Sequence, residues 1–470
     1  MKTSLGPKVA LGVSAFGLLA LVLAFLGLRI GGGWVAIVLS LGCAAGGACA
    51  AFWLAHRQET PGIKNHGVMF GSLTARGVIG WALGLLFTGF YIVLYFYEDF
   101  RSRGFPGVLD GGIRLLDPLA RLLSGHDADK WFLYGTLYTL AILVMGVRML
   151  MKYRHSRYQQ IRTLSVMFFQ LGFAFLVPSF LKLLEEPEYY FTYFWPLKHS
   201  YGWPDGVHHL GTSGRWGIYF VAFGAFMILV ATPLLTYRFG KRWYCSWVCG
   251  CGGLAETVGD PWRQNSNKST RAWRIERFTV HGVLVAVVVA TAVLWIDSAR
   301  RGEWLGEWSS PFARAYGLYI GAIFSGVVGV GFYPVLGSRV WCRFGCPMAA
   351  ILGIFQRFWS RFRITTNGGQ CISCGNCSTY CEMGIDVRSY AQRQENIIRA
   401  SCVGCGVCAA VCPRGVLALE NGRTHGDRFP GSDRPLEAFL QAVGVHERDG
   451  LDGNILRPGR CDPHASRGVD

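Results

Sequence analysis

The chain has 470 residues, of which 51% are hydrophobic and 16% charged, and its mean hydropathy is +0.29. This composition excludes an ordinary soluble globular protein and is typical of a polytopic helical membrane protein. Apolar spans tolerate little charge, so the net charge of +17 must lie in loops and tails, where it sets topology and attracts anionic lipids or acidic partners rather than nucleic acid.

Eight apolar stretches have about the 20 residues that a membrane-crossing helix needs. The first five are expected to build an N-terminal transmembrane region over residues 1–210, and the last three a second region over 211–350. The expected spans are 9–28, 34–55, 77–97, 131–151, 164–184, 216–236, 279–296 and 316–336.

Lys and Arg are concentrated in the loops after the second, fourth and sixth spans and after the last one. The positive-inside rule places these segments in the cytoplasm. An even number of spans then puts both termini on the cytoplasmic side of the inner membrane. The basic loop over residues 237–278 is explained by this topology or, alternatively, by docking of an acidic redox carrier.

Two further segments follow the last span. Residues 351–420 are expected to form a small α+β ferredoxin-like module, reached through a basic aromatic stretch that suits either an interfacial helix or a plain connector. Residues 421–470 are polar and without periodicity, which predicts a poorly ordered tail.

Two cysteine runs in this module carry the strongest signal. Both read CxxCxxCxxxC, and each cysteine of the second run lies 31 residues after its counterpart in the first: Cys371, Cys374, Cys377 and Cys381, then Cys402, Cys405, Cys408 and Cys412. This rhythm is typical of two [4Fe-4S] clusters in which the fourth cysteine of each run ligates the other cluster. We therefore pair Cys371, Cys374 and Cys377 with Cys412, and Cys402, Cys405 and Cys408 with Cys381.

A structural zinc site is the alternative, but zinc prefers four ligands in separated pairs. Glu382 stands where a proline usually follows the fourth cysteine, which removes no ligand.

A second cysteine pattern lies at the membrane edge. Cys245 and Cys249 follow the sixth span, Cys342 and Cys346 follow the eighth, and the second pair lies 97 residues after the first, as in an internal repeat. If each CxxxC forms a helical turn, its two sulfurs share a face, and the four could bind a further metal or iron-sulfur centre. A reversible dithiol and plain structural cysteines are the rival interpretations, and Cys251 is a spare ligand.

These spans, CxxxC pairs and cysteine runs resemble the NapH, NosR and CcoG group of membrane-bound polyferredoxins over about residues 216–420. The CxxxCP motif of that group matches Cys342, Cys346 and Pro347, whereas Gly250 replaces the proline after Cys249. The resemblance implies electron relay between the quinone pool and a redox partner, or a membrane reductase that supports metalloenzyme maturation.

The chain contains no Walker A motif, Rossmann fingerprint or HExxH sequence, so no catalytic residue is predicted and electrons must come from other molecules. The aromatic loop over residues 185–215, with His199, His208 and His209, suits a quinone pocket, a partner site or an aromatic belt. We expect an electron-transfer component of an oxidoreductase system. A metal reductase acting at the CxxxC cysteines and a redox sensor are the alternatives.

Overall fold

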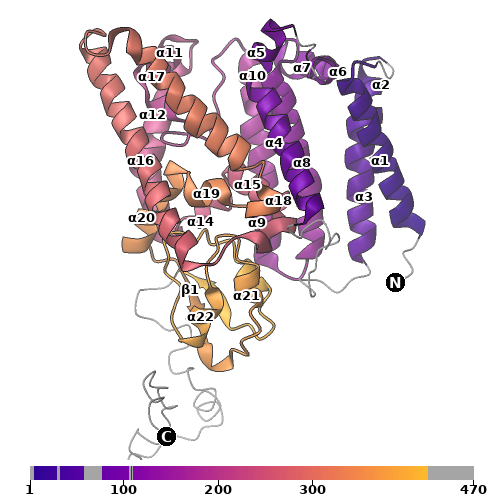
Figure 1. Cartoon of the computed structure of the whole chain (residues 1–470), viewed down its shortest axis with the longest axis vertical. Coiled ribbons are helices and arrows are strands. Elements are labelled where there is room, and N and C mark those ends of the chain that lie inside the picture. The colour runs from indigo at the N-terminus through magenta and orange to yellow at the C-terminus, as the bar shows by residue number, and fades with distance from the viewer. Residues whose placement is uncertain (1–4, 29–31, 58–76, 105–106, 108, 422–470) are drawn as a thin grey trace, which may run out of the picture. The chain divides into compact units, whose positions relative to one another are not determined.

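The computed structural model describes residues 5–28, 32–57, 77–104, 107 and 109–421, so the tail expected to be poorly ordered lies outside the described residues apart from Asn421. The described part is mostly helical and contains one two-stranded sheet, which confirms the mostly α fold class. Seven helical segments in it are long and apolar enough to cross a membrane: Leu5–Phe25, Trp34–Arg57, Val78–Tyr95, Lys130–Lys152, Arg157–Leu183, Gly217–Phe239 and Thr270–Ala299. The protein is therefore a multi-pass membrane protein (Figure 1). In the element names below, η denotes a 3-10 or π-helical stretch.

The first two spans form a hairpin held by small residues. A Cβ atom at Gly17 would lie 2.2 Å from the Ala44 nitrogen, and one at Gly47 would lie 2.5 Å from the Ser14 nitrogen, so only glycine permits this approach. The Ser14 hydroxyl donates to the Ala44 carbonyl at 2.9 Å. The elements are α1 (Leu5–Phe25), α2 (Trp34–Ile37), η1 (Val38–Gly42) and α3 (Cys43–Arg57).

Three short helices join the third span to the fourth, and a short turn joins the fourth to the fifth. The Asp129 carboxylate caps α8 by accepting from the Phe132 amide at 2.6 Å. The elements are α4 (Val78–Tyr95), α5 (Tyr97–Ser102), α6 (Asp110–Leu115), α7 (Asp117–Ser124), α8 (Lys130–Lys152), α9 (Arg157–Leu171), η2 (Gly172–Leu176) and α10 (Val177–Leu183).

The sixth and seventh spans flank a set of short helices. The loop expected over residues 237–278 is in fact folded: it contains two short α-helices, a 3-10 helix and the first turns of α16. The elements are η3 (His199–Gly202), α11 (Pro204–Thr212), α12 (Gly217–Phe226), η4 (Met227–Ala231), α13 (Thr232–Phe239), α14 (Arg242–Cys245), α15 (Gly250–Thr257), η5 (Asp260–Asn265) and α16 (Thr270–Ala299).

The expected eighth span differs from the prediction of residues 316–336. Its helix starts earlier and ends at Val328, short of the second CxxxC pair, and it is not among the seven spanning segments. Gly329 and Gly331 end it, and a Cβ at Gly331 would lie 2.5 Å from the Thr88 hydroxyl of α4. The elements are η6 (Gly306–Trp308), α17 (Ser309–Tyr316), η7 (Gly317–Val328), α18 (Tyr333–Leu336), α19 (Val340–Phe344) and α20 (Pro347–Phe358).

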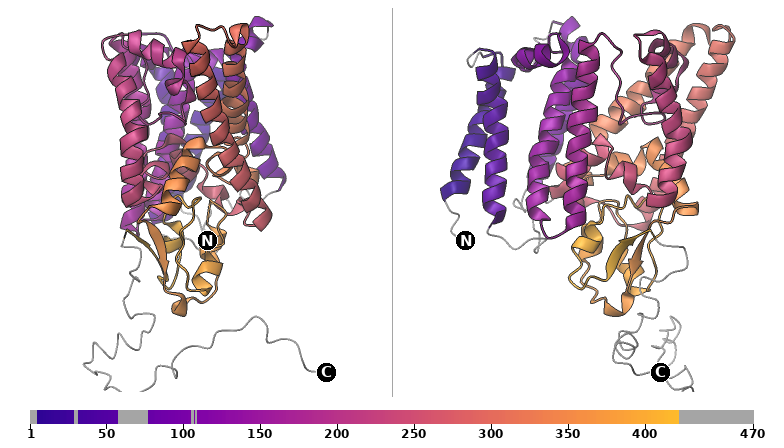
Figure 2. Two further views of the ribbon diagram at one scale, coloured as in Figure 1. Left: turned by 90° about the vertical axis from the view of Figure 1, so that its left-hand side faces the viewer. Right: turned by 180° about the vertical axis from the view of Figure 1, so that it is seen from behind.

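Helix α20 leads directly into the ferredoxin-like module, which lies at one end of the helices (Figures 1 and 2). Strand β1 (Arg363–Thr366) pairs antiparallel with β2 (Leu417–Glu420), with Arg363 opposite Glu420 and Thr366 opposite Leu417, so the sheet closes the module. Between the strands lie η8 (Gly368–Gln370), α21 (Asn376–Thr379), α22 (Val387–Gln392) and α23 (Val407–Ala410).

Candidate iron-sulfur site

The two cysteine runs share one backbone conformation. Ser373 and Gly404 have φ of 58° and 61°, Gly375 and Gly406 have 78° and 73°, and Gly384 and Gly415 have 65° and 62°. Each pair is separated by the same 31 residues as the cysteines. The turns at Gly375 and Gly406 each begin a one-turn helix, α21 and α23, that carries the third cysteine of its run. The chain therefore repeats a tight loop that turns backbone amides and three thiols toward one point.

The eight thiols gather into two sets. A small hollow is lined by Cys371, Cys374, Cys377 and Cys412. Cys408 lies within electrostatic range of Cys405, Cys402 and Cys381, and also of Cys377 from the first run.

Burial raises the pKa of the Cys377 thiol to about 11 and likewise that of the Cys402 thiol to about 11. Such thiols ionise readily only when a metal binds them, so the donor sets and the repeated loops fit iron-sulfur clusters.

The second run, residues 402–408, is held against the membrane helices, and we call it the inner loop. The Tyr158 hydroxyl donates to the Gly404 carbonyl at 2.8 Å, and the Gln159 amide donates to the Cys405 carbonyl at 2.8 Å. The Ser246 hydroxyl donates to the Val403 carbonyl at 2.8 Å, and the Gln356 amide donates to the Cys402 carbonyl at 2.7 Å. Three side chains from the membrane region and one from α20 therefore fix this loop.

The first run, residues 371–377, has a different environment, and we call it the outer loop. Cys374 is exposed and Ile372 is 57% exposed. The Gln392 amide nitrogen, which belongs to the module itself, donates to the Ser373 hydroxyl at 2.8 Å. The outer loop therefore lies on the surface of the module.

The two CxxxC pairs also share a local structure, which is not the continuous helical turn expected. In each pair the first cysteine lies in a short helix, α14 or α19, and the second is the N-cap of the next helix, α15 or α20. Pro347 occupies the first position of α20, where a proline cannot continue the preceding helix.

Gly250 occupies the same position of α15, and a Cβ there would lie 2.4 Å from the Tyr193 hydroxyl and 2.8 Å from the Gln170 Oε1 atom. Glycine replaces proline because these side chains pack directly on the backbone.

The four CxxxC thiols converge although their motifs are far apart in the sequence. Cys245, Cys249, Cys342 and Cys346 are each buried, with 5–7% exposure. Cys346 lies within electrostatic range of the other three. The hydrogen bond from the Cys251 thiol, together with backbone amides at the start of α15, lowers the pKa of Cys249 to about 7. Burial instead raises the pKa of Cys245 to about 12.

The spacing of these thiols bears on what they could bind. Among the described residues, the only three ligand-type side chains gathered within 4.8 Å of one another are Glu256, Glu382 and Cys405. Four thiolates around one zinc ion would lie about 3.8 Å apart, given a Zn–S bond of about 2.3 Å. Among the described residues, no three of the CxxxC thiols or of the ferredoxin thiols lie within 4.8 Å of one another.

A cavity of about 870 Å³ reaches this region from between the membrane helices. Its inner end is lined by Tyr138, Gln170, Tyr193, Cys251, Trp341 and Pro347. Its other end is lined by polar residues, among them Asp99, Asp127, Asp129, Lys182 and His199. Burial lowers the pKa of His199 to about 4, so this imidazole is neutral at pH 7.

The aromatic loop over residues 185–215 divides between two roles. Tyr190, Tyr193 and His199 line the cavity. Tyr189 instead stacks on Tyr201 and on Phe220, with ring centroids 4.8 Å apart in both cases. His208 and His209 are exposed and take no part in the cavity.

Sequence reasoning missed a group of buried charges near the inner loop. Glu256, Asp260 and Glu276 are the acids of the basic segment 237–278, and all three are buried and paired with arginine. The signal was available, since isolated acids beside a cysteine motif seldom serve topology. Their partners Arg162 and Arg339 are 94 and 83 residues from Glu256, and no local pattern predicts such pairs.

Two family models match the chain. One, described as a 4Fe-4S dicluster domain, matches residues 370–417. The other, described as a 4Fe-4S binding domain, matches twice, over residues 221–269 and 318–367. Each of these two matches contains one CxxxC pair.

Several curated proteins are similar to parts of the chain. The putative electron transport protein YccM of Escherichia coli is 27% identical over 178 residues, which are 36% of this chain and 48% of YccM. The methylamine utilization ferredoxin-type protein MauN of Paracoccus denitrificans is 29% identical over 153 residues, 30% of this chain and 48% of MauN. The regulatory protein NosR of Stutzerimonas stutzeri is 27% identical over 196 residues, 38% of this chain and 25% of NosR.

The chain thus spans about half the length of the first two relatives and a quarter of the third. No solved structure matches it. These findings confirm the resemblance expected from the cysteine motifs: the protein is a polytopic membrane iron-sulfur protein of electron transport, similar to the NosR and NapH group.

Proposed function

We propose that the protein relays electrons between the membrane quinone pool and a redox partner, through iron-sulfur centres in the ferredoxin-like module and at the CxxxC pairs. One observation carries the proposal. Cysteines of both CxxxC pairs and of both cysteine runs lie in a single buried core, which includes Cys249, Cys346, Cys402, Cys408 and Cys377. Redox centres held there are linked by packed protein, with no water-filled gap to cross.

The module holds two [4Fe-4S] clusters in this proposal. Cys371, Cys374, Cys377 and Cys412 ligate the outer cluster, and Cys402, Cys405, Cys408 and Cys381 ligate the inner one. The repeated loops support the assignment, because amides turned toward the sulfurs stabilise the reduced cluster. The bound clusters supply one-electron transfer, and the protein positions them and controls their exposure.

A further iron-sulfur centre binds Cys245, Cys249, Cys342 and Cys346. The convergence of the four thiols supports this site, as does the match of each pair to a 4Fe-4S binding family. The rival dithiol interpretation needs two thiols that pair reversibly, and it does not account for four buried thiols from two copies of one motif.

The cavity is the proposed quinone site. Its volume of about 870 Å³ is in the usual range for a small-molecule site, and its inner end meets Cys251 and Trp341 beside the CxxxC cysteines. The Gln170 amide nitrogen donates to the Thr139 hydroxyl at 3.0 Å, while its oxygen is buried with no hydrogen-bond partner among the described atoms. That oxygen would accept from a quinol hydroxyl, and the Tyr193 hydroxyl would donate to a quinone carbonyl.

The proposed orientation places the module and both chain termini on the cytoplasmic side of the inner membrane. The basic side chains near the module, such as Arg242, Arg357 and Arg361, support it under the positive-inside rule. The partner then docks where the outer loop is exposed.

The test is quinol-driven cluster reduction in proteoliposomes. Gln170→Leu and Tyr193→Phe should slow it about tenfold each, since a hydrogen bond to the head group is worth roughly 1–1.5 kcal/mol. Reduction by dithionite should be unchanged. Tyr219→Phe is the matched control, because Tyr219 is 63% exposed. Unchanged quinol-driven rates in both variants would contradict the quinone assignment.

A metal reductase is the second candidate, supported by one observation. The polar end of the cavity carries Asp127 and Asp129, which would attract a metal cation toward the thiols. Metal binding without quinol that is lost in Cys249→Ser and Cys346→Ser would favour it over the relay.

A further inference from the structure

A network of buried charges joins the membrane helices to the inner loop. Asp260 accepts from Arg148 and Lys152, both at 2.7 Å, and from Arg263 at 3.1 Å. Glu256 pairs with Arg339 at 2.6 Å, with Arg263 at 3.3 Å and with Arg162. The network therefore links α8 and α9 to α15 and η5.

Glu382 extends the network into the module. This residue follows the cluster ligand Cys381 and pairs with Arg263 at 3.0 Å and with Arg339 at 3.1 Å. Its side chain is fully buried. The departure from proline at this position is therefore explained, since a proline could not make either ion pair.

The charges of the network do not cancel. Five cations (Arg148, Lys152, Arg162, Arg263 and Arg339) face three carboxylates (Glu256, Asp260 and Glu382), and every one of these side chains is at most 3% exposed. Uncompensated charge in a buried site is costly, so a neighbouring anion is needed to balance the excess.

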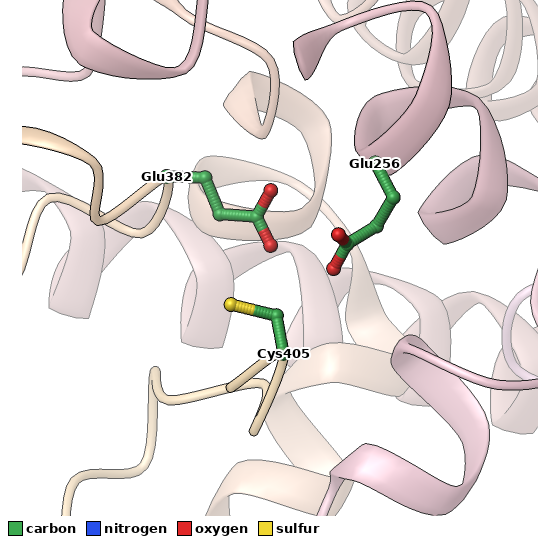
Figure 3. A group of neighbouring side chains, drawn as sticks. All are labelled: Glu256, Glu382 and Cys405. Carbon is green, nitrogen blue, oxygen red and sulfur yellow. The ribbon is translucent and has the colours of Figure 1, made fainter. Parts of the chain in front are cut away.

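The cysteine sulfurs are the neighbouring groups that can carry this negative charge. The Cys405 sulfur lies within 4.8 Å of carboxylate oxygens of Glu256 and Glu382, and Figure 3 shows the two carboxylate groups facing each other beside Cys405. Arg339 also donates to the Cys342 sulfur at 3.7 Å and to the Cys245 carbonyl at 3.1 Å. It therefore contacts the CxxxC site and, through Glu382, the inner loop.

A metal ion bound by Glu256, Glu382 and Cys405 would be an alternative. However, both carboxylates already pair with two or more arginines, and the local charge is positive, which repels a cation. The arrangement suits an anion that gains charge, as a thiolate-ligated cluster does on reduction.

We propose that Arg339 and Glu382 are positioning residues that set the reduction potential of the inner cluster and couple it to the CxxxC centre. This inference rests on the proposed ligand assignment. The positive excess stabilises the reduced form of the inner cluster, so its potential lies above that of the outer cluster. The negative charge of Glu382 reduces this rise in potential. Arg339 also contacts the CxxxC site, so its charge acts on both centres.

The experiment is a redox titration of the purified full-length protein, followed by electron paramagnetic resonance. Cys374→Ser first identifies the signal of the outer cluster. Glu382→Gln should then shift the inner cluster to a higher potential, because a negative charge is removed. Arg339→Gln should shift the inner cluster to a lower potential. Arg339→Lys keeps the positive charge and should have a potential close to that of the wild type.

The opposite signs separate this role from a structural one, which would change both variants in the same direction. The control is Glu395→Gln, in an ion pair with Arg393 that is about half exposed, and it should leave both potentials unchanged. If Arg339→Gln does not assemble its clusters, the upward shift in Glu382→Gln decides the matter alone.

Shifts of the same sign, no shift, or equal shifts of both clusters would overturn the inference. A protein that shows the predicted shifts but is not reduced by quinol would refute the quinone relay and leave the inference intact.

Discussion

The inner and outer loops have the same cysteine spacing and the same two left-handed turns, yet their surroundings differ. The inner loop accepts hydrogen bonds from Tyr158, Gln159 and Ser246 of the membrane region and from Gln356 of α20. The outer loop ends at the surface, with Cys374 exposed. The sequence repeat therefore supplies the local loop geometry, whereas tertiary contacts distinguish the two loops. In the proposed relay, the inner loop holds the membrane-side cluster and the outer loop holds the cluster that faces the partner.

Removing one proposed ligand from each loop in turn should have the largest effect and should show whether the two loops hold different clusters. Cys405→Ala should abolish the inner cluster's resonance signal and prevent quinol-driven reduction of the outer cluster. Cys374→Ala should remove the outer signal and leave the inner cluster reducible by quinol. Cys43→Ala, in the second span, is the control. Unchanged iron and sulfide content in either variant would contradict the ligand assignment.

Breaking the charge network should separate the inner loop from the membrane helices. Glu256→Gln leaves three arginines short of a buried partner and should destabilise the protein by about 3–5 kcal/mol. Glu395→Gln, in an exposed pair, should cost at most about 1 kcal/mol. Thermal unfolding midpoints in detergent provide the measurement, and equal midpoints would refute a structural role for the network.

The same variant has a pH signature. Burial would raise the pKa of Glu256, but Arg162, Arg339 and Arg263 outweigh it and hold that pKa well below its usual range. The stability from this group is therefore complete above the unfolded carboxyl pKa of about 4.3 and is lost as the pH falls below it. The wild-type midpoint should fall more steeply than that of Glu256→Gln as the pH is lowered from about 5 to about 3.

Gly250→Ala should disturb the contact between the cavity and the CxxxC site. Its Cβ would lie 2.4 Å from the Tyr193 hydroxyl, and overpacking of this kind costs about 1–3 kcal/mol. Quinol-driven reduction should slow more than dithionite reduction. Gly282→Ala is the matched control because nothing lies within 4 Å of its Cβ position. Equal effects in the two variants would show that Gly250 has no role at the proposed quinone site.

Single hydrogen bonds give the smallest and sharpest test. Ser246→Ala removes one contact to the inner loop and should cost about 1 kcal/mol, whereas Gln392→Ala removes an exposed contact to the outer loop and should cost less. Amide hydrogen exchange is measured in the inner loop (402–408) and the outer loop (371–377). Relative to the wild type, it should be faster only in the inner loop of Ser246→Ala. Equal acceleration in both loops would contradict the anchoring.

Much of this organisation could be predicted from residue patterns. Hydropathy located seven spans, and the cysteine spacing predicted the iron-sulfur chemistry, because both depend on local sequence. The end of η7 at Val328 was missed, since a glycine pair in an apolar run has little effect on hydropathy. The CxxxC pairs were expected to be helical, but the residue after each second cysteine begins a new helix. The pairing of Glu382 with Arg339 depends on tertiary contacts that no local pattern encodes.

The exposure of Cys374 has a consequence for survival in air. Dioxygen and peroxide reach a cluster through solvent, and the sulfur at position 374 is open to it while Cys402 and Cys408 are buried. In the proposed relay, oxidative damage should therefore begin at the outer cluster, and electron transfer to the partner should fail before the centre nearest the membrane is lost.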